Sequence, residues 1–132
     1  MIRRNKATVL GKQPNPFRWI AADDFARMVC TAFLKPEARN KLFYVFGREP
    51  ILMKDLLSDY CKAVHPDIKK VSSAPLGFMK FLSGLTKNNE LGNAVELFSY
   101  FEKVKEPCNT KETELLLGKP EITFQKWLEK ID

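Results

Sequence analysis

The sequence predicts a helix-rich α/β fold with few strands. Most of the chain carries apolar residues three and four positions apart, which is the spacing of one buried helical face. One continuous apolar run, 42–46, ends at Gly47 and predicts a strand that is buried on both faces and therefore belongs to a parallel sheet. The other strand candidates, 7–10, 18–21 and 70–74, are short. These strands are too few to complete a doubly wound sheet.

The first helix is predicted over residues 24–34. Asp23 precedes it as a good N-cap residue, and Asp24 complements the helix dipole in the first turn. Pro36 ends the helix shortly after its last apolar residue. The expected buried stripe consists of Phe25, Met28, Val29, Ala32 and Phe33.

Three more helices are predicted after the strand. The first spans 53–64, has Asp55 in its first turn and ends before Pro66, and the others span 76–85 and 91–104. Their apolar faces are formed by Leu56, Leu57, Tyr60 and Val64 in the first, by Phe78, Met79, Phe81, Leu82 and Leu85 in the second, and by Leu91, Ala94, Val95, Phe98 and Phe101 in the third.

A terminal helix is predicted to begin after Thr123, whose hydroxyl makes it a good N-cap residue. Ile122 precedes this cap and is expected to pack on Trp127 as a hydrophobic staple. Such a staple would fix the angle at which the chain enters its last helix.

Length and composition are those of one soluble globular domain. The 132 residues are 45% hydrophobic and 29% charged, so we expect a single lobe over 1–132. No apolar run approaches the roughly 20 residues that span a bilayer, and residues 1–6 lead into no long apolar stretch of the signal-peptide type. We therefore expect a cytoplasmic protein without a membrane partner.

Positive charge is concentrated at the start of the chain. The net charge is +6, and the basic N-terminal segment, residues 1–22, contains no acidic residue. Its cationic residues are Arg3, Arg4, Lys6, Lys12 and Arg18. Such an arm is compatible with nucleic-acid binding, but no zinc-finger spacing or RNA-recognition motif accompanies it. Binding to nucleic acid is therefore not favoured.

Motifs for cofactor binding and catalysis are missing from the sequence. No two glycines are separated by one residue, so no G-x-G-x-x-G loop exists, and no lysine stands four positions after a tyrosine. One histidine and three scattered cysteines do not make a zinc site. We assign no catalytic, cofactor-binding or metal-binding residue to this chain.

The cysteines are predicted to be reduced. Cys30, Cys61 and Cys108 are odd in number and far apart, and we expect Cys30 and Cys61 to be partly buried on helices. Cys61 and His65 stand four apart, so a cysteine–histidine nucleophile is an alternative. No third group that would orient the pair is evident.

Three segments, in this order, resemble a known family. Residues 18–29 are similar to the v-x-x-x-D-v-A helix start, 41–49 to a strand that ends in G-x-e, and 110–118 with 123–128 to the closing L-L-G and T-x-x-x-W-L motifs. Together they resemble the C-terminal half of extended and atypical short-chain dehydrogenases/reductases, including the NmrA-like NAD(P)-binding proteins.

Two positions depart from the family pattern. Leu52 stands where a Ser or Thr commonly caps the helix after the strand. Phe17 stands where the sugar-nucleotide epimerases carry an arginine, and Arg18 is one residue too close to the aspartate pair to replace it. A nucleotide-sugar substrate is therefore not favoured.

The resemblance implies a C-terminal substrate-binding lobe of a Rossmann-like protein from which the N-terminal Rossmann half is absent. The full-length protein is then expected to be an NAD(P)-dependent oxidoreductase or epimerase-like protein, and this chain alone is expected to bind no cofactor and to catalyse nothing. For an apolar substrate cleft we select Phe17, Trp19, Phe78 and Met79, for which ordinary core packing is the alternative.

Two other functions stay open. The first is a non-enzymatic NAD(P)-sensing regulator, since the residues that separate catalysis from sensing would lie upstream. The second is a protein-interaction module, in which an exposed sheet edge and apolar helices pair with the missing Rossmann half, another chain or a second copy. The substrate itself is not indicated.

Overall fold

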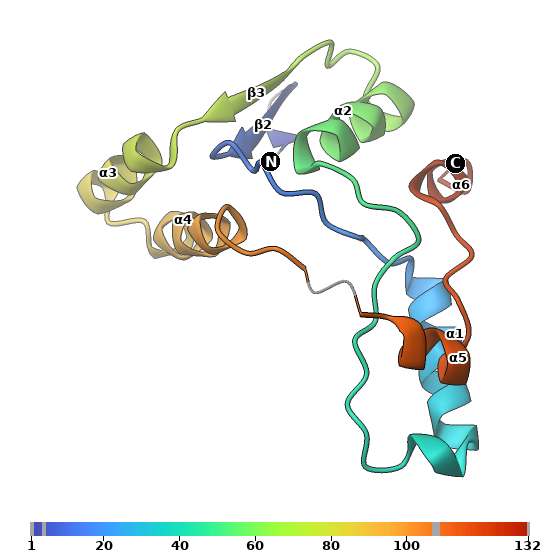
Figure 1. The fold of residues 1–132 in the computed structure, drawn as a ribbon. Helices are drawn as coiled ribbons and strands as arrows, with labels where there is room; N and C mark the ends of the chain where they lie inside the picture. The colour runs from blue at the N-terminus through green and yellow to red at the C-terminus, as the bar shows by residue number, and fades with distance from the viewer. Residues whose placement is uncertain (1, 4, 107–108, 132) are drawn as a thin grey trace. The chain divides into compact units, whose positions relative to one another are not determined.

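The computed structural model describes residues 2–3, 5–106 and 109–131. Arg4 of the basic N-terminal segment and the third cysteine, Cys108, lie outside these residues. The protein is α/β and about half helical, and its chain divides into two compact units (Figure 1). Unit 1 contains Met1–Phe17 and Ile51–Lys105, and unit 2 contains Arg18–Pro50 and Glu106–Asp132.

A three-stranded sheet forms the centre of unit 1. Its strands are β1 (Ile2–Arg3), β2 (Lys6–Leu10) and β3 (Val71–Ala74), in the order β1-β2-β3. β1 runs antiparallel to β2, whereas β3 runs parallel to it, with Ala7 opposite Val71. The strand candidates at 7–10 and 70–74 are thus confirmed, and they form the parallel pair.

Helix α2 (Met53–Val64) packs on this sheet, with the bounds that the sequence predicts. The most buried side chains of the helix, Met53, Leu57 and Cys61, recur every four residues, and the predicted face beside them is half-buried. The core of unit 1 consists of Ala7, Val9, Met53, Leu57, Cys61, Ile68 and Val71.

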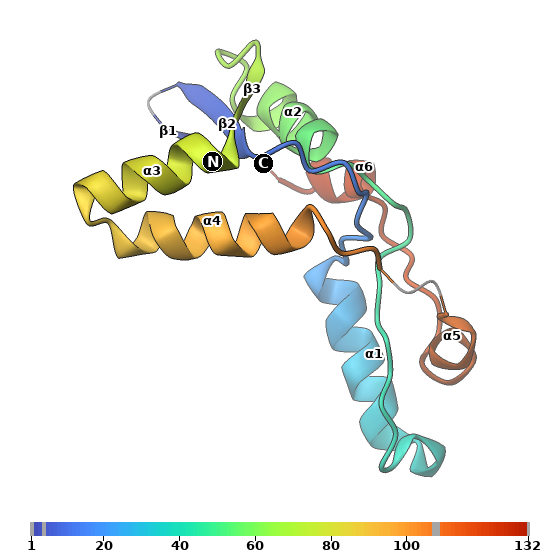
Figure 2. The ribbon, with the colours of Figure 1, turned by 60° about the vertical axis from the view of Figure 1, so that its left-hand side comes forward.

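Two antiparallel helices complete unit 1, α3 (Leu76–Thr86) and α4 (Asn89–Phe101), which lie side by side (Figure 2). Lys87 takes a left-handed conformation in the turn, with φ of 50°, and the Asn88 side chain accepts a hydrogen bond from the Leu91 N–H at 3.0 Å. The predicted helices are confirmed, although α4 ends three residues earlier than expected. The outer face of α3 leaves Phe78, Phe81 and Leu85 exposed.

Unit 2 is built around helix α1 (Ala22–Leu34), followed by the short 3-10 helix η1 (Pro36–Ala38). Helices α5 (Lys111–Leu117) and α6 (Phe124–Leu128) come from the end of the chain, and α5 contacts α1. The core consists of Met28, Ala38 and Leu117, with Phe43, Val45 and Leu116 among the partly buried residues packed on it.

The predicted buried stripe of α1 is confirmed at Met28 and Ala32 but is wrong at Phe25, Val29 and Phe33. Met28 is buried, but Phe25 is 49% and Phe33 87% exposed, and the most buried neighbour on the helix is Asp24. The face that packs inward runs through Asp24, Met28 and Ala32. The prediction used the spacing of apolar residues alone, and such spacing does not indicate that the Asp24 carboxylate is buried.

The predicted strand at 42–46 is also wrong, because this segment belongs to no ladder. Its backbone is extended and its side chains alternate as in a strand: Phe43 and Val45 pack on the core, whereas Leu42 is 81% exposed. In both ribbon views the segment runs beside α1 (Figures 1 and 2). The candidate strand at 18–21 is not formed either. Among the described residues of unit 2, no second strand is available to pair with them.

The terminal helix begins as predicted. The Thr123 hydroxyl accepts a hydrogen bond from the Lys126 N–H at 3.2 Å, and the Trp127 ring stacks on Phe124 at a centroid distance of 5.8 Å. None of the helices in the described part of the chain is long and apolar enough to cross a bilayer.

Candidate functional site

Asp24 organises the part of unit 2 that forms the candidate site. Its carboxylate is 3% exposed and accepts hydrogen bonds from the Glu121 and Ile122 N–H groups at 2.9 and 2.8 Å. It also accepts a bond from the Arg27 guanidinium at 2.9 Å, and the same Arg27 nitrogen donates to the Lys119 carbonyl at 2.7 Å. The first turn of α1 therefore holds the loop 119–122 in place.

These partners keep Asp24 ionised. Burial alone would raise the pKa of its carboxyl, but the Arg27 guanidinium and the two backbone N–H donors outweigh burial and hold the pKa below its ordinary value. The predicted N-cap role of Asp23 is wrong: the N-cap position is Ala21, and Asp23 lies at the surface, 3.4 Å from Lys130. Of the aspartate pair, the second residue thus has the structural role.

A second anchor lies where the extended segment ends. The Gly47 N–H donates to the Arg18 carbonyl at 2.9 Å, and a Cβ at Gly47 would overlap the carbonyl oxygen of Trp19. Only glycine allows two backbones to approach this closely. The segments that carry Arg18 and Arg48 are thereby held against each other.

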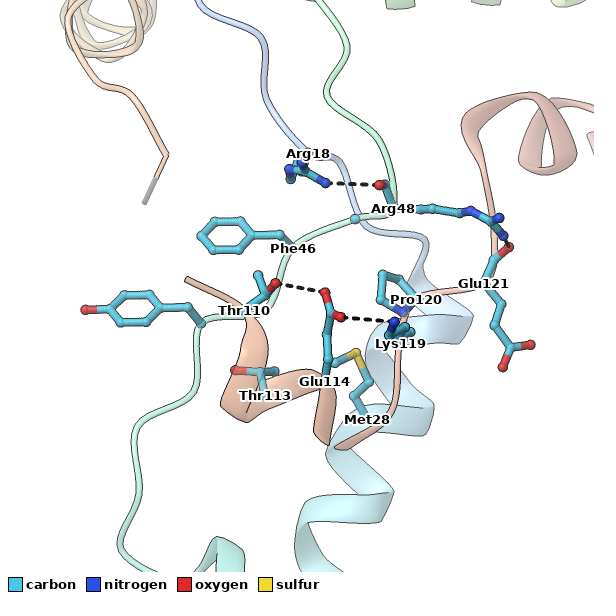
Figure 3. A pocket seen from close by; sticks show the side chains of 12 residues that line it. Arg18, Met28, Phe46, Arg48, Thr110, Thr113, Glu114, Lys119, Pro120 and Glu121 are labelled. Atoms are coloured by element: carbon cyan, nitrogen blue, oxygen red, sulfur yellow. Dashed lines mark hydrogen bonds and ion pairs between the residues drawn. The ribbon is translucent and has the colours of Figure 1, made fainter. Parts of the chain in front are cut away.

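Between these anchors unit 2 contains a cavity of about 370 Å³ (Figure 3). Its walls come from the segment before α1, the middle of α1, the extended segment and the two residues after it, the start of α5 with the residue before it, and the loop that follows α5. The lining residues are Arg18, Met28, Tyr44, Phe46, Gly47, Arg48, Thr110, Thr113, Glu114, Lys119, Pro120 and Glu121. The volume falls within the range of small-molecule sites.

Three cations and two carboxylates line the cavity, and they are not all paired. Lys119 lies 3.8 Å from Glu114, which also accepts a hydrogen bond from the Thr110 hydroxyl at 2.8 Å (Figure 3). Arg18 donates to the Arg48 carbonyl at 3.0 Å, and Arg48 donates to the Glu121 carbonyl at 3.4 Å. Both guanidinium groups thus contact neutral carbonyl groups.

The four predicted substrate-binding residues do not line this cavity. Phe17, Phe78 and Met79 belong to unit 1, and Trp19 belongs to unit 2. Phe17 is buried, with its ring 5.4 Å from that of Phe101, whereas Phe78 and Trp19 are exposed. Their role in substrate binding stays a prediction.

Arg18 and Arg48 are the site residues that sequence reasoning missed. In the sequence, Arg18 belongs to the basic segment 1–22 and stands one residue too close to the aspartate pair to replace the epimerase arginine, and Arg48 belongs to a turn motif. Arg18 stands next to Trp19, and Arg48 stands next to Gly47. Neither neighbour indicates that the two segments meet in the fold. The close approach at Gly47 brings them together.

The cysteine chemistry considered from the sequence is not favoured by the structure. Cys61 is buried, and burial raises the pKa of its thiol, which keeps it protonated. The His65 ring packs against Tyr60 at a centroid distance of 5.9 Å. Cys30 is exposed on α1, so the prediction that it is partly buried is wrong. Among the described residues, no group of three or more histidine, cysteine or acidic side chains is arranged to hold a metal ion.

Comparison of the chain with protein-family models, with curated proteins and with solved structures finds no significant match.

Proposed function

We propose that this chain is the substrate-facing lobe of an NAD(P)-dependent oxidoreductase-like protein, whose dinucleotide-binding half is a separate Rossmann unit. The order of the three family-like segments is the starting point of this proposal. The cofactor then binds to the other half, and the cavity of unit 2 holds part of the substrate.

The observation that carries the proposal is the unpaired extended segment 42–46. No backbone N–H or C=O group of these residues is hydrogen-bonded to another backbone group in the described chain. Its two ends are fixed, because Lys41 donates to the Ala38 carbonyl at 3.3 Å and Gly47 donates to Arg18. Unpaired backbone groups beside an apolar core are costly, and an edge of this kind is a template for another strand. A sheet of the missing half supplies that strand.

The pattern of side chains along the segment agrees with a strand at the margin of a sheet. Phe43 and Val45 pack on the core of unit 2, and Tyr44 and Phe46, on the alternate positions, line the cavity. The segment thus presents one face to the core and the other to the cavity. Pairing with a further sheet would satisfy its backbone without disturbing either face.

Hydrogen exchange of the backbone amides tests this proposal directly. We expect the amides of 42–46 to exchange rapidly in the 132-residue chain and to be protected in the protein purified from cells with an antibody to this segment. The amides of α2 serve as the control, because their helical hydrogen bonds are internal and should be equally protected in both. Equal, rapid exchange of 42–46 in both samples would refute the proposed pairing.

The intact mass and cofactor binding of the cellular protein complete the test. We expect a mass well above 15.2 kDa and saturable NADPH binding that the 132-residue chain lacks. A cellular protein of 15.2 kDa, or one of larger mass that binds neither NADH nor NADPH, contradicts the proposal. Binding without turnover of any oxidisable or reducible substrate would favour the regulator instead.

A second candidate function, the interaction module, is favoured by the outer face of α3. Phe78, Phe81 and Leu85 lie on one side of the helix, and all three are more than half exposed. Sedimentation velocity of the 132-residue chain tests self-association. A dimer that becomes monomeric in Phe81→Lys favours the module, and a monomer at all concentrations counts against it.

A further inference from the structure

We propose that the cavity of unit 2 binds an organic anion whose charged group is joined to a planar apolar body, such as an aryl carboxylate or an aryl phosphate. This inference rests on the proposed function in one respect, because it takes the cavity as the substrate site and names the class of substrate. Its test measures binding to this chain directly, so the missing half is not needed.

The charge requirement comes from Arg18 and Arg48. No carboxylate of the described residues forms an ion pair with either guanidinium group. The Glu106 carboxylate accepts a hydrogen bond from the backbone N–H of Arg18 at 2.8 Å, and each guanidinium group donates one hydrogen bond to a carbonyl oxygen of the described residues. A guanidinium group has five N–H donors, so most of them remain available to a carboxylate or phosphate, which it binds in a planar, two-pronged geometry.

The remaining charges of the cavity do not cancel this excess. Glu114 is engaged by Lys119 and by the Thr110 hydroxyl. The Glu121 side chain extends away from the Glu114–Lys119 pair (Figure 3). With three cations and two carboxylates, the residues that line the cavity carry a net charge of +1, and this excess attracts an anion.

Two aromatic rings in the wall of the cavity, those of Tyr44 and Phe46, suggest that the ligand has a planar apolar body. The rings of Tyr44 and Phe46 lie nearly parallel, 3° apart, with centroids separated by 6.5 Å, because they alternate along the extended segment. Met28, which is buried, contributes an apolar surface to the same cavity. A flat apolar group gains more from such a wall than a flexible polar chain does.

The site is held in shape before any ligand arrives. Asp24 and Arg27 fix the loop 119–122, and Gly47 fixes Arg48 close to the segment of Arg18. Cys30, Cys61 and His65 do not line the cavity. A site that is preorganised in this way loses little conformational entropy when the anion binds.

Calorimetric titration of the folded chain tests the proposal. Four probes are compared: benzoate, phenyl phosphate, inorganic phosphate and the neutral benzyl alcohol. We expect saturable binding of benzoate or phenyl phosphate, at least about tenfold tighter than benzyl alcohol, which corresponds to about 1.4 kcal/mol. Inorganic phosphate should bind more weakly than phenyl phosphate, because it lacks the planar body. The stronger of the two aryl probes identifies the anionic group.

Charge-removing variants locate the binding. Arg18→Gln and Arg48→Gln should each weaken binding of the aryl anion by about tenfold or more, since each removes charge-assisted hydrogen bonds to the anion. Arg39→Gln is the matched control, because Arg39 is an exposed arginine of unit 2 that does not line the cavity, and it should leave binding unchanged. Arg48 is exposed, so its variant should fold even where Arg18→Gln does not.

The following outcomes would overturn one of the two proposals. Equal weakening by all three arginine variants would show a general charge effect and overturn the proposal, as would equal binding of benzyl alcohol or no saturable binding of either aryl anion. A cellular protein of 15.2 kDa would refute the proposed oxidoreductase lobe and leave the titration result standing. The two failures are therefore distinguishable.

Discussion

Replacement of Asp24 by Asn should destabilise unit 2 by about 1.5–6 kcal/mol, depending on how far the site relaxes. Asp24 accepts three hydrogen bonds within 2.9 Å, two from backbone N–H groups and one from Arg27. An asparagine oxygen can serve only one side, so its NH₂ group must face either Arg27 or the two N–H donors. The variant loses at least one charge-assisted hydrogen bond, which contributes about 1.5–3 kcal/mol. Where the site does not relax, the NH₂ group of Asn also faces buried N–H donors, at a further cost of about 1–3 kcal/mol.

Urea unfolding followed by tryptophan fluorescence measures this change in unit 2 alone. Both tryptophans, Trp19 and Trp127, belong to unit 2, so their emission is a selective probe. Asp23→Asn is the matched control, because the Asp23 side chain is 75% exposed and its contact with Lys130 is 3.4 Å long. We expect the control to stay within about 0.5 kcal/mol of the wild type. Equal effects of the two substitutions would refute the assignment of Asp24 as the anchor.

The effect of Asp24 should also depend on pH in a defined direction. Its pKa is lowered in the folded state, so the unfolded chain binds more protons as the pH falls below about 4, the ordinary range of an aspartate. The stabilisation is complete above the unfolded pKa and is lost as the pH falls through the lower, folded pKa. The difference between wild type and Asp24→Asn should therefore be constant near neutral pH and shrink in acid. A difference that grows in acid would contradict the sign.

Three further outcomes are expected. Gly47→Ala should cost about 2 kcal/mol or more in the same fluorescence assay, because its Cβ overlaps the Trp19 carbonyl oxygen; unchanged stability would show that the two backbones separate easily. The Glu102 carboxylate accepts hydrogen bonds from the backbone N–H groups of residues 12 and 13. Glu102→Gln should weaken these bonds by about 1–2 kcal/mol in total and so increase amide hydrogen exchange at both residues; unchanged exchange would show that the two bonds do not protect these amides. A maleimide followed by peptide mapping should label the exposed Cys30 much faster than Cys61, whose burial raises the pKa of its thiol; equal rates in the folded chain would place Cys61 at the surface.

Local signals in the sequence predicted several elements closely. The bounds of α2 follow from its spacing and from Pro66, which stands two residues beyond its end. Thr123 caps the last helix with the predicted hydrogen bond. Helix starts and stops are decided by the residues next to them, through hydrogen bonds that span three or four positions. Such features need no knowledge of distant parts of the chain.

Other predictions failed because their outcome depends on residues far away. The apolar run 42–46 has the composition of a buried strand, but a strand exists only where a neighbour pairs with it, and none does among the described residues. On α1 the spacing of Phe25 and Phe33 predicted a buried stripe, yet Asp24 takes the inward position because its donors come from the loop almost a hundred residues later. Apolar spacing alone does not include such a partner.

The sequence by itself determined the helix-rich α/β class, the bounds of α2 and, within one residue, of α3, and the absence of a dinucleotide-binding motif, because these follow from short-range spacing and from residue types. Only the tertiary structure decided that Arg18 and Arg48 line one cavity and that Asp24, rather than Asp23, is the buried anchor. The physical reason is that a site forms where distant segments meet. Which segments meet is settled by close backbone approach and hydrogen bonding, as at Gly47, and not by neighbouring residues.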